Sequence, residues 1–111
     1  MAFYPPNPYP DLMVDIETLS TRPNAAILSI AAVPFNHETG TYSEVNFYKE
    51  IDEKLYGPEF HLDAKTVAWW DKQIQHKPQG TTPPRFALLD FAVYLTQTLP
   101  TYLWANSPSF D

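Results

Sequence analysis

The sequence predicts an α/β fold in which three consecutive strands precede two helices and a fourth short strand. Two observations support this: apolar residues alternate or run together in the first half of the chain, and they recur at helical spacing in the second half. The chain has 111 residues, of which 44% are hydrophobic and 15% aromatic. That is enough apolar material for the core of one domain.

Residues 1–10 predict an extended arm that precedes the folded domain. Four prolines lie in this segment, at Pro5, Pro6, Pro8 and Pro10. Proline has no backbone N–H and a fixed φ, so this composition disfavours both helices and strand ladders. The folded domain is therefore expected to span residues 11–111.

The first half of the domain predicts three strands joined by short turns. Residues 12–17 alternate around a short apolar stretch, and residues 25–35 are almost continuously apolar, as expected of a strand buried on both faces. Residues 42–51 alternate again. Turn-forming residues separate these segments at 20–24 and 36–40. Three strands with short links predict an antiparallel meander.

A first helix is expected after Asp63, which is a suitable N-cap. Val67, Trp70 and Ile74 then fall on one apolar stripe, which Trp69 widens. The spacing predicts a helix with one apolar face.

A second helix is expected from Pro84, because proline is favoured in a first helical turn. Its apolar stripe contains Leu88, Phe91, Ala92, Leu95 and Leu99. Pro100 ends it, and residues 102–105 predict a fourth short strand. Ser107 and Pro108 then resemble the start of another helix.

The composition limits the chemistry that the chain can perform. It contains no cysteine, which excludes disulfides, thiolate metal sites and a catalytic thiol, so any metal must bind oxygen or imidazole. No apolar run approaches the roughly 20 residues of a membrane span, and the first residues do not resemble a signal peptide. We therefore expect a cytoplasmic protein that does not bind membranes.

The net charge argues against a simple nucleic-acid-binding module. Asp and Glu number 13 against 7 Lys and Arg, which gives a formal charge of −6. The charge counts less against a nuclease, because such enzymes use carboxylates to hold cations that then meet the phosphates. Ordinary solubility explains the charge equally well.

Asp15 and Glu17 are the first candidate site residues. They lie two apart on the first predicted strand, so their carboxylates leave the same face and can converge on one cation. Val14 and Ile16 point the other way. The alternative is that these acids face water on an edge strand, since Asp-x-Glu is frequent by chance.

Asp111 is the third candidate. Residues 103–111 run from the fourth strand into the first turn of a helix, where free backbone N–H groups and the helix dipole stabilise a carboxylate. The alternative is a first-turn aspartate that only stabilises its helix.

Five segments together resemble, in order, the DnaQ-like or DEDD 3′-to-5′ exonucleases, within which the exoribonuclease-like and phage exodeoxyribonuclease VIII-like group is most similar. The segments are Met13–Leu19, Ile27–Ala32, Trp69-Trp70, Trp104-Ala105-Asn106 and Phe110-Asp111. The resemblance implies an RNase H-like fold with a mixed sheet, in which a parallel strand joins the antiparallel three-stranded meander. It also implies hydrolysis from the 3′ end of single-stranded RNA or DNA.

The resemblance also implies a two-cation site for Mg²⁺ or Mn²⁺, whose ions lie roughly 3.5–4 Å apart. Asp15 would bridge both ions, Glu17 would bind the ion that activates water, and Asp111 would hold the second. Thr18 would lie near the 3′-hydroxyl of the terminal nucleotide and Leu19 against its base. Turn chemistry and packing are the alternative roles of Thr18 and Leu19.

The double tryptophan has two possible roles. Aromatic rings can stack on the bases of a single strand. Trp70, however, belongs to the apolar stripe of its helix, which favours core packing. Trp69 is expected to lie closer to the surface.

The last motif of the resembled family has no counterpart here. That motif supplies a fourth carboxylate, preceded four or five residues earlier by a His or Tyr that helps to activate water. None of the three histidines, His37, His61 and His76, has an acid at that spacing. Tyr48 and Asp52 have it but precede Asp111, so we interpret it as coincidence.

These observations predict a domain that is incomplete at its C-terminus and is an inactive or weak exonuclease. Two alternatives remain. The chain could be a catalytically dead remnant that still binds metal or nucleic acid, or that has no activity at all. It could also be an interaction domain in which the acids are solvated and the Pro-rich arm binds a partner.

Overall fold

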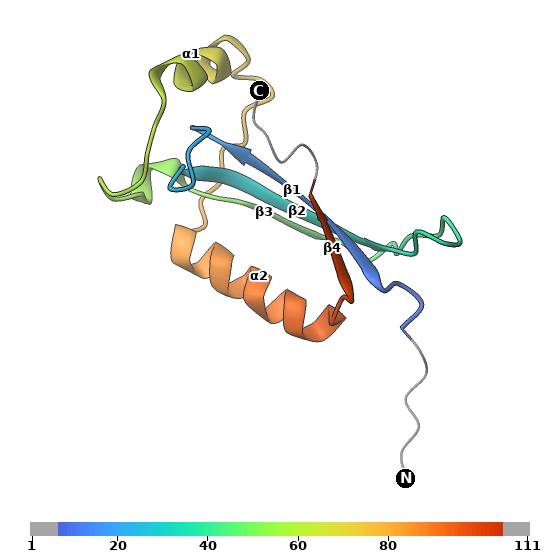
Figure 1. The fold of residues 1–111 in the computed structure, drawn as a ribbon. Coiled ribbons are helices and arrows are strands. Elements are labelled where there is room, and N and C mark those ends of the chain that lie inside the picture. The colour runs from blue at the N-terminus through green and yellow to red at the C-terminus, as the bar shows by residue number, and fades with distance from the viewer. Residues whose placement is uncertain (1–6, 106–111) are drawn as a thin grey trace.

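A four-stranded mixed sheet forms the centre of the molecule in the computed structural model, which describes residues 7–105 (Figure 1). The elements in chain order are β1 (Asp11–Thr18), β2 (Ile27–Phe35), β3 (Phe47–Glu50), the 3₁₀ helix η1 (Glu53–Leu55), α1 (Ala64–Lys72), α2 (Pro84–Thr98) and β4 (Tyr102–Ala105). The strand order is β3-β2-β1-β4. β1, β2 and β3 form an antiparallel meander, and β4 runs parallel to β1. The predicted mixed α/β architecture is confirmed.

α2 covers one face of the sheet (Figure 1). Ile16 of β1 lies opposite Ile30 of β2, and both side chains pack with Ala87 and Phe91 of α2. Because side chains alternate along a strand, the neighbours of Ile16 in β1 point to the other face. This core layer therefore places Asp15 and Glu17 on the side of the sheet away from α2.

The buried side of α2 is rotated by about one residue from the predicted stripe. Ala87 is fully buried, and the rings of Phe91 and Tyr94 lie 5.3 and 5.1 Å from the ring of Phe47 in β3. The predicted stripe is wrong at three exposed residues, namely Leu88, Ala92 and Leu99. The small side chain of Ala87 lets α2 approach the sheet closely. The helix therefore buries the face that contains Ala87 and the rings of Phe91 and Tyr94.

α1 begins as predicted and packs against the sheet through Trp70, with Val67 of the predicted stripe beside it. The Asp63 carboxylate caps the helix by accepting a hydrogen bond from the Thr66 backbone N–H. Trp70 is buried with Leu19, Ala26 and Leu28, whereas Trp69 is 52% exposed, so both expectations for the tryptophans are confirmed. The placement of Ile74 on the helical stripe is wrong, because α1 ends at Lys72 and Ile74 is half exposed.

The third strand is shorter than predicted. The ladder covers residues 47–50 rather than 42–51, and Val45 is 76% exposed. Pro34 of β2 explains the loss of pairing. Its carbonyl accepts a hydrogen bond from the Ser43 N–H on the β3 side. A regular antiparallel pair would also have the N–H of residue 34 donate to that side, but proline has no N–H. The second strand likewise begins at Ile27 rather than at Ala25.

The described part of the proline-rich arm lies along the end of α2 and the start of β4. The Pro10 carbonyl accepts hydrogen bonds from the N–H groups of Thr101 and Tyr102, and the Asn7 side-chain amide donates to the Thr98 carbonyl at 3.2 Å. Residues 7–10 are thus fixed against the domain.

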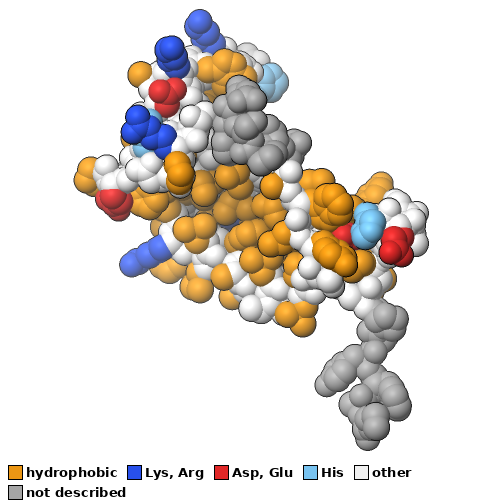
Figure 2. Space-filling model, in the orientation of Figure 1, with side chains coloured by type: hydrophobic (Ala, Val, Ile, Leu, Met, Phe, Trp, Pro, Cys, Tyr) orange, Lys and Arg blue, Asp and Glu red, His pale blue; other side chains and the backbone are white. Residues whose placement is uncertain are grey.

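Hydrophobic side chains cover much of the surface around α2 and β4, whereas Lys and Arg gather near α1 (Figure 2). Neither of the helices in the described part of the chain is long and apolar enough to cross a membrane.

Candidate functional site

Asp15 and Glu17 lie side by side on the face of the sheet opposite α2, as the alternation of β1 predicts. Asp15 is exposed and Glu17 is partly buried. β1 lies between β2 and β4 in the strand order, but β4 pairs only with Asp11–Val14. Within the described residues, Asp15 and Glu17 therefore have a paired strand on the β2 side alone, and the exposure of Asp15 agrees with the alternative that these acids face water at a strand edge. α1 docks at the end of β1 rather than across this face, because the Trp70 indole N–H donates to the Thr18 carbonyl (Figure 1).

Small residues of β2 separate the two acids from β3. Ala31 lies opposite Asp15, and on its other side Tyr48 of β3 lies opposite Ala31. Because directly paired residues in a sheet share a face, Tyr48 projects on the same side as Asp15. Ala31 is only partly buried, so the expectation that β2 is buried on both faces is wrong at this position.

A second row of paired residues runs parallel to the first. Ser29 of β2 lies opposite Glu17, and Glu50 of β3 lies opposite Ser29. The Tyr48 hydroxyl donates a hydrogen bond to Glu50 Oε1 at 2.8 Å, which links the two rows. Sequence reasoning noticed Tyr48 only for its spacing to Asp52. The position of Tyr48 beside the acids depends on how β1, β2 and β3 pair, and residue spacing in the sequence does not reveal that pairing.

Negative charge is concentrated on this face. Burial raises the pKa of Glu17, and the charge of Asp15 raises it further. Burial also raises the pKa of Tyr48, as do its hydrogen bond to Glu50 and the charges of Glu50 and Glu17. A cation bound between the acids would relieve this repulsion.

Replacing Glu17 with glutamine is expected to raise the melting temperature by about 2–5 °C at neutral pH without divalent cations. A raised pKa in the folded state favours folding at low pH, and this contribution is lost as the pH rises through the folded pKa. Glutamine does not ionise, so the Glu17→Gln variant does not lose this stability as the pH rises. Melting curves of Glu17→Gln and of an exposed control, Glu44→Gln, should diverge as the pH rises. Parallel curves from pH 4 to 8 would show that Glu17 is not repelled in the folded chain.

The chemistry of the donors fits a hard divalent cation. Asp15 and Glu17 supply only oxygen, and Mg²⁺ commonly binds through one or two carboxylates, with waters and substrate phosphates completing the shell. Within residues 7–105, no group of three or more His, Cys, Asp or Glu residues is placed to hold a metal ion. The third predicted ligand, Asp111, and the helix start at Ser107 and Pro108 lie outside the described residues.

The side chains of Thr18 and Leu19 point into the protein. The Thr18 hydroxyl donates to the Ser20 carbonyl at 2.7 Å, and Leu19 is fully buried in the cluster around Trp70. The structure thus shows the turn chemistry and packing that were the alternative roles of these residues. Their contact with a nucleotide stays a prediction.

A buried aspartate that sequence reasoning missed lies at the start of β1. Asp11 is fully buried and accepts hydrogen bonds from the His37 backbone N–H at 2.9 Å and the Trp104 indole N–H at 2.9 Å, and it contacts His37 Nδ1 at 2.8 Å. Burial alone would raise the pKa of Asp11, but these hydrogen bonds outweigh it and lower the pKa. Asp11 of β1 therefore links β1 to the β2–β3 hairpin through His37 and to β4 through Trp104.

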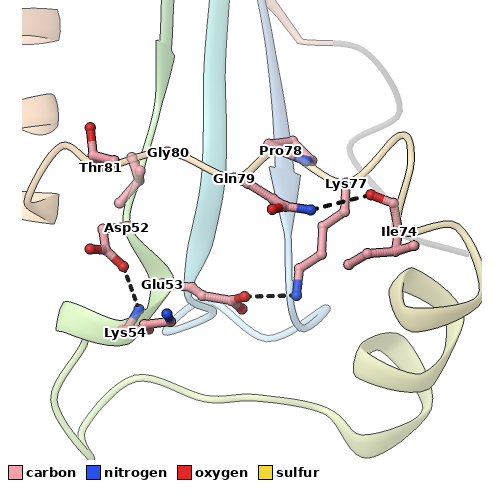
Figure 3. Close-up of a pocket in the computed structure, with 10 residues that line it drawn as sticks. Asp52, Glu53, Lys54, Ile74, Lys77, Pro78, Gln79, Gly80 and Thr81 are labelled. Carbon is pink, nitrogen blue, oxygen red and sulfur yellow. Dashed lines mark hydrogen bonds and ion pairs between the residues drawn. The ribbon is translucent and has the colours of Figure 1, made fainter.

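A separate cavity of about 340 Å³ lies between η1 and the segment that joins α1 to α2 (Figure 3). Two of its charged groups form an ion pair, in which the Lys77 ammonium lies 2.7 Å from Glu53 Oε1, and the Asp52 carboxylate caps η1 by accepting a hydrogen bond from the Lys54 backbone N–H. A Cβ at Gly80 would come within 2.1 Å of the Glu50 backbone, so only glycine allows this close approach to β3. Its lining residues do not include Asp15, Glu17 or Tyr48, so the cavity is separate from the acidic face.

Comparisons with known proteins identify a family and a similar fold. Residues 10–111 match the family described as the 3'-5' exoribonuclease Rv2179c-like domain. No curated protein has a significant sequence match. A solved structure described as the crystal structure of cell-death related nuclease 4 (CRN-4) has a similar fold, with a TM-score of 0.52 and 10% sequence identity. The similarity covers 92% of this chain but only 37% of that chain. Because the family match spans nearly the whole sequence, this chain belongs to the Rv2179c-like 3'-5' exoribonuclease domain family.

Proposed function

We propose that this chain carries the site of a metal-dependent 3′-to-5′ exonuclease that hydrolyses phosphodiesters in single-stranded nucleic acid. The observation that carries the proposal is the placement of Asp15 and Glu17, two residues apart on β1 and on the sheet face away from α2. The family description favours RNA over DNA as the substrate. The strand order, with β4 parallel to β1, supports the RNase H-like assignment. The similarity to phage exodeoxyribonuclease VIII-like enzymes rests on sequence alone and stays a hypothesis.

Divalent cations, when bound, would supply an activated water and neutralise the charge that develops on the leaving oxygen. Asp15 and Glu17 would hold them, and we propose Asp111 as a further ligand. Asp15 is exposed, so its carboxylate is accessible to a phosphate with its cation. Because the pKa of Glu17 is raised, a proton competes with a cation for this site up to a higher pH than at an isolated glutamate.

The 111-residue chain is expected to be a slow enzyme. It carries three of the four carboxylates that the resemblance implies, and it has no counterpart of the His or Tyr that helps to activate water. The absence of a general base costs a factor of about 10²–10⁴ in rate. Mn²⁺, which binds N/O sites tightly, is expected to support more activity than Mg²⁺.

The test is a 5′-labelled single-stranded RNA and a DNA of the same sequence, incubated with the chain and Mn²⁺, Mg²⁺ or a chelator. We expect a slow ladder of products shortened from the 3′ end, formed on RNA with Mn²⁺ and absent with the chelator. Products from internal cleavage, or cleavage that persists with the chelator, would contradict the proposal.

A second candidate function is nucleic-acid binding without hydrolysis. It is favoured by the placement of Asp15 and Glu17 on one face, because two carboxylates are enough to hold a cation that binds a phosphate. Cation-dependent binding of RNA with no ladder after prolonged incubation would select this function.

A further inference from the structure

Tyr48 is an exposed aromatic residue that projects beside the two acids. We propose that its ring is a stacking platform for a base of the single-stranded RNA whose backbone lies at Asp15 and Glu17. This inference rests on the proposed function and adds a residue that positions the substrate.

The register of the sheet fixes where Tyr48 lies relative to Asp15. Ala31 is paired with both residues, so Asp15, Ala31 and Tyr48 form one row on the same face. Neighbouring strands lie about 4.8 Å apart, which separates the backbones of Asp15 and Tyr48 by roughly 10 Å. One strand of RNA can therefore contact both side chains. Because the side chain of Ala31 is only a methyl group, no large side chain lies between Asp15 and Tyr48 in this row.

The ring of Tyr48 is accessible and held in place. The residue is 58% exposed, whereas the adjacent Phe47 packs against α2. The Tyr48 hydroxyl is fixed by its hydrogen bond to Glu50. An exposed ring with a fixed orientation suits stacking, because a base can contact it without first ordering the side chain.

The charges around Tyr48 determine when this contact can form. Glu17 and Glu50 both act on the Tyr48 hydroxyl, so the face repels phosphates until cations occupy the acids. The nearest lysine in β3, Lys49, points to the other face and lies 3.4 Å from Asp90 of α2. Stacking on Tyr48 should therefore contribute to RNA binding only when divalent cations are present.

The test measures binding of a short fluorescein-labelled oligouridylate to the full chain by fluorescence anisotropy, with Ca²⁺ or Mn²⁺ and with a chelator. Tyr48→Ala is expected to weaken binding roughly 5- to 100-fold with cations, and Tyr48→Trp to retain binding within about threefold. Phe86→Ala is the matched control, because Phe86 is 47% exposed and lies on α2, which covers the other face of the sheet. Melting temperatures identify any variant that fails to fold.

Each outcome bears on a different claim. If Asp15→Asn weakens binding but Tyr48→Ala does not, the stacking role is wrong and the proposed function stands. If Tyr48→Trp is as weak as Tyr48→Ala while both fold, the contact is not ring stacking and the inference fails. If the unsubstituted chain binds no oligouridylate with either cation, both the inference and the proposed function fail.

Discussion

Replacing Trp70 with alanine is expected to destabilise the folded chain by about 3–5 kcal/mol, the usual cost of removing a large buried aromatic side chain. Trp70 is 6% exposed and packs with Leu19 and Leu28, and its indole N–H donates to the Thr18 carbonyl at 3.0 Å. The substitution removes this packing and leaves a backbone carbonyl at the end of β1 without its donor. α1 should then separate from the sheet.

The neighbouring tryptophan provides the control for this prediction. Trp69 is 52% exposed, so Trp69→Ala should cost about 1 kcal/mol or less. Urea unfolding followed by far-UV circular dichroism measures both variants. Equal losses for Trp69→Ala and Trp70→Ala would mean that the burial of Trp70 does not hold α1 against the sheet.

Asp15→Asn is expected to lower the Mn²⁺-dependent shortening of RNA by roughly 100-fold or more. Asparagine keeps the shape of aspartate but removes the charge that holds a cation. Because Asp15 is exposed and repels Glu17, its loss should leave the melting temperature unchanged or slightly higher without cations. The measurement compares initial rates of 3′ shortening at equal protein concentration.

Asp71→Asn is the matched control, because Asp71 is exposed on α1 and lies off the acidic face. It should retain the parent rate. If the Asp15→Asn variant shortens RNA as fast as the unsubstituted chain, the hydrolysis comes from another site or from a contaminating nuclease.

The elements that could be predicted from the sequence are those fixed by local chemistry. Asp63 caps α1 and Pro84 opens α2, because a cap and a first-turn proline act within a few residues. The strand period of two also placed Asp15 and Glu17 together on one face of β1.

The elements that could not be predicted depend on contacts distant in sequence. α2 carries two overlapping apolar stripes, and only its packing on Phe47 selects the one containing Ala87 and Phe91. β3 is short because Pro34 of the preceding strand cannot complete the ladder. In both cases the deciding residue belongs to another element.

The same limit applies to the site. Tyr48 and Glu50 join the acidic face only through the register of β2 between β1 and β3. The burial of Asp11 depends on donors from His37 and Trp104, which lie 26 and 93 residues away in the chain. Asp15 and Glu17 could be predicted from the spacing within one strand, whereas their neighbours Tyr48 and Glu50 depend on the pairing of three strands.

The central claim is that Asp15 and Glu17 bind divalent cations. A titration of Mn²⁺ followed by electron paramagnetic resonance, which detects free Mn²⁺ directly, tests it without any dependence on turnover. The account predicts saturable Mn²⁺ binding by the parent chain, competition by Mg²⁺, and loss of this binding in the variant that combines Asp15→Asn with Glu17→Gln. Mn²⁺ binding of equal affinity and stoichiometry in the parent and the double variant would contradict the account.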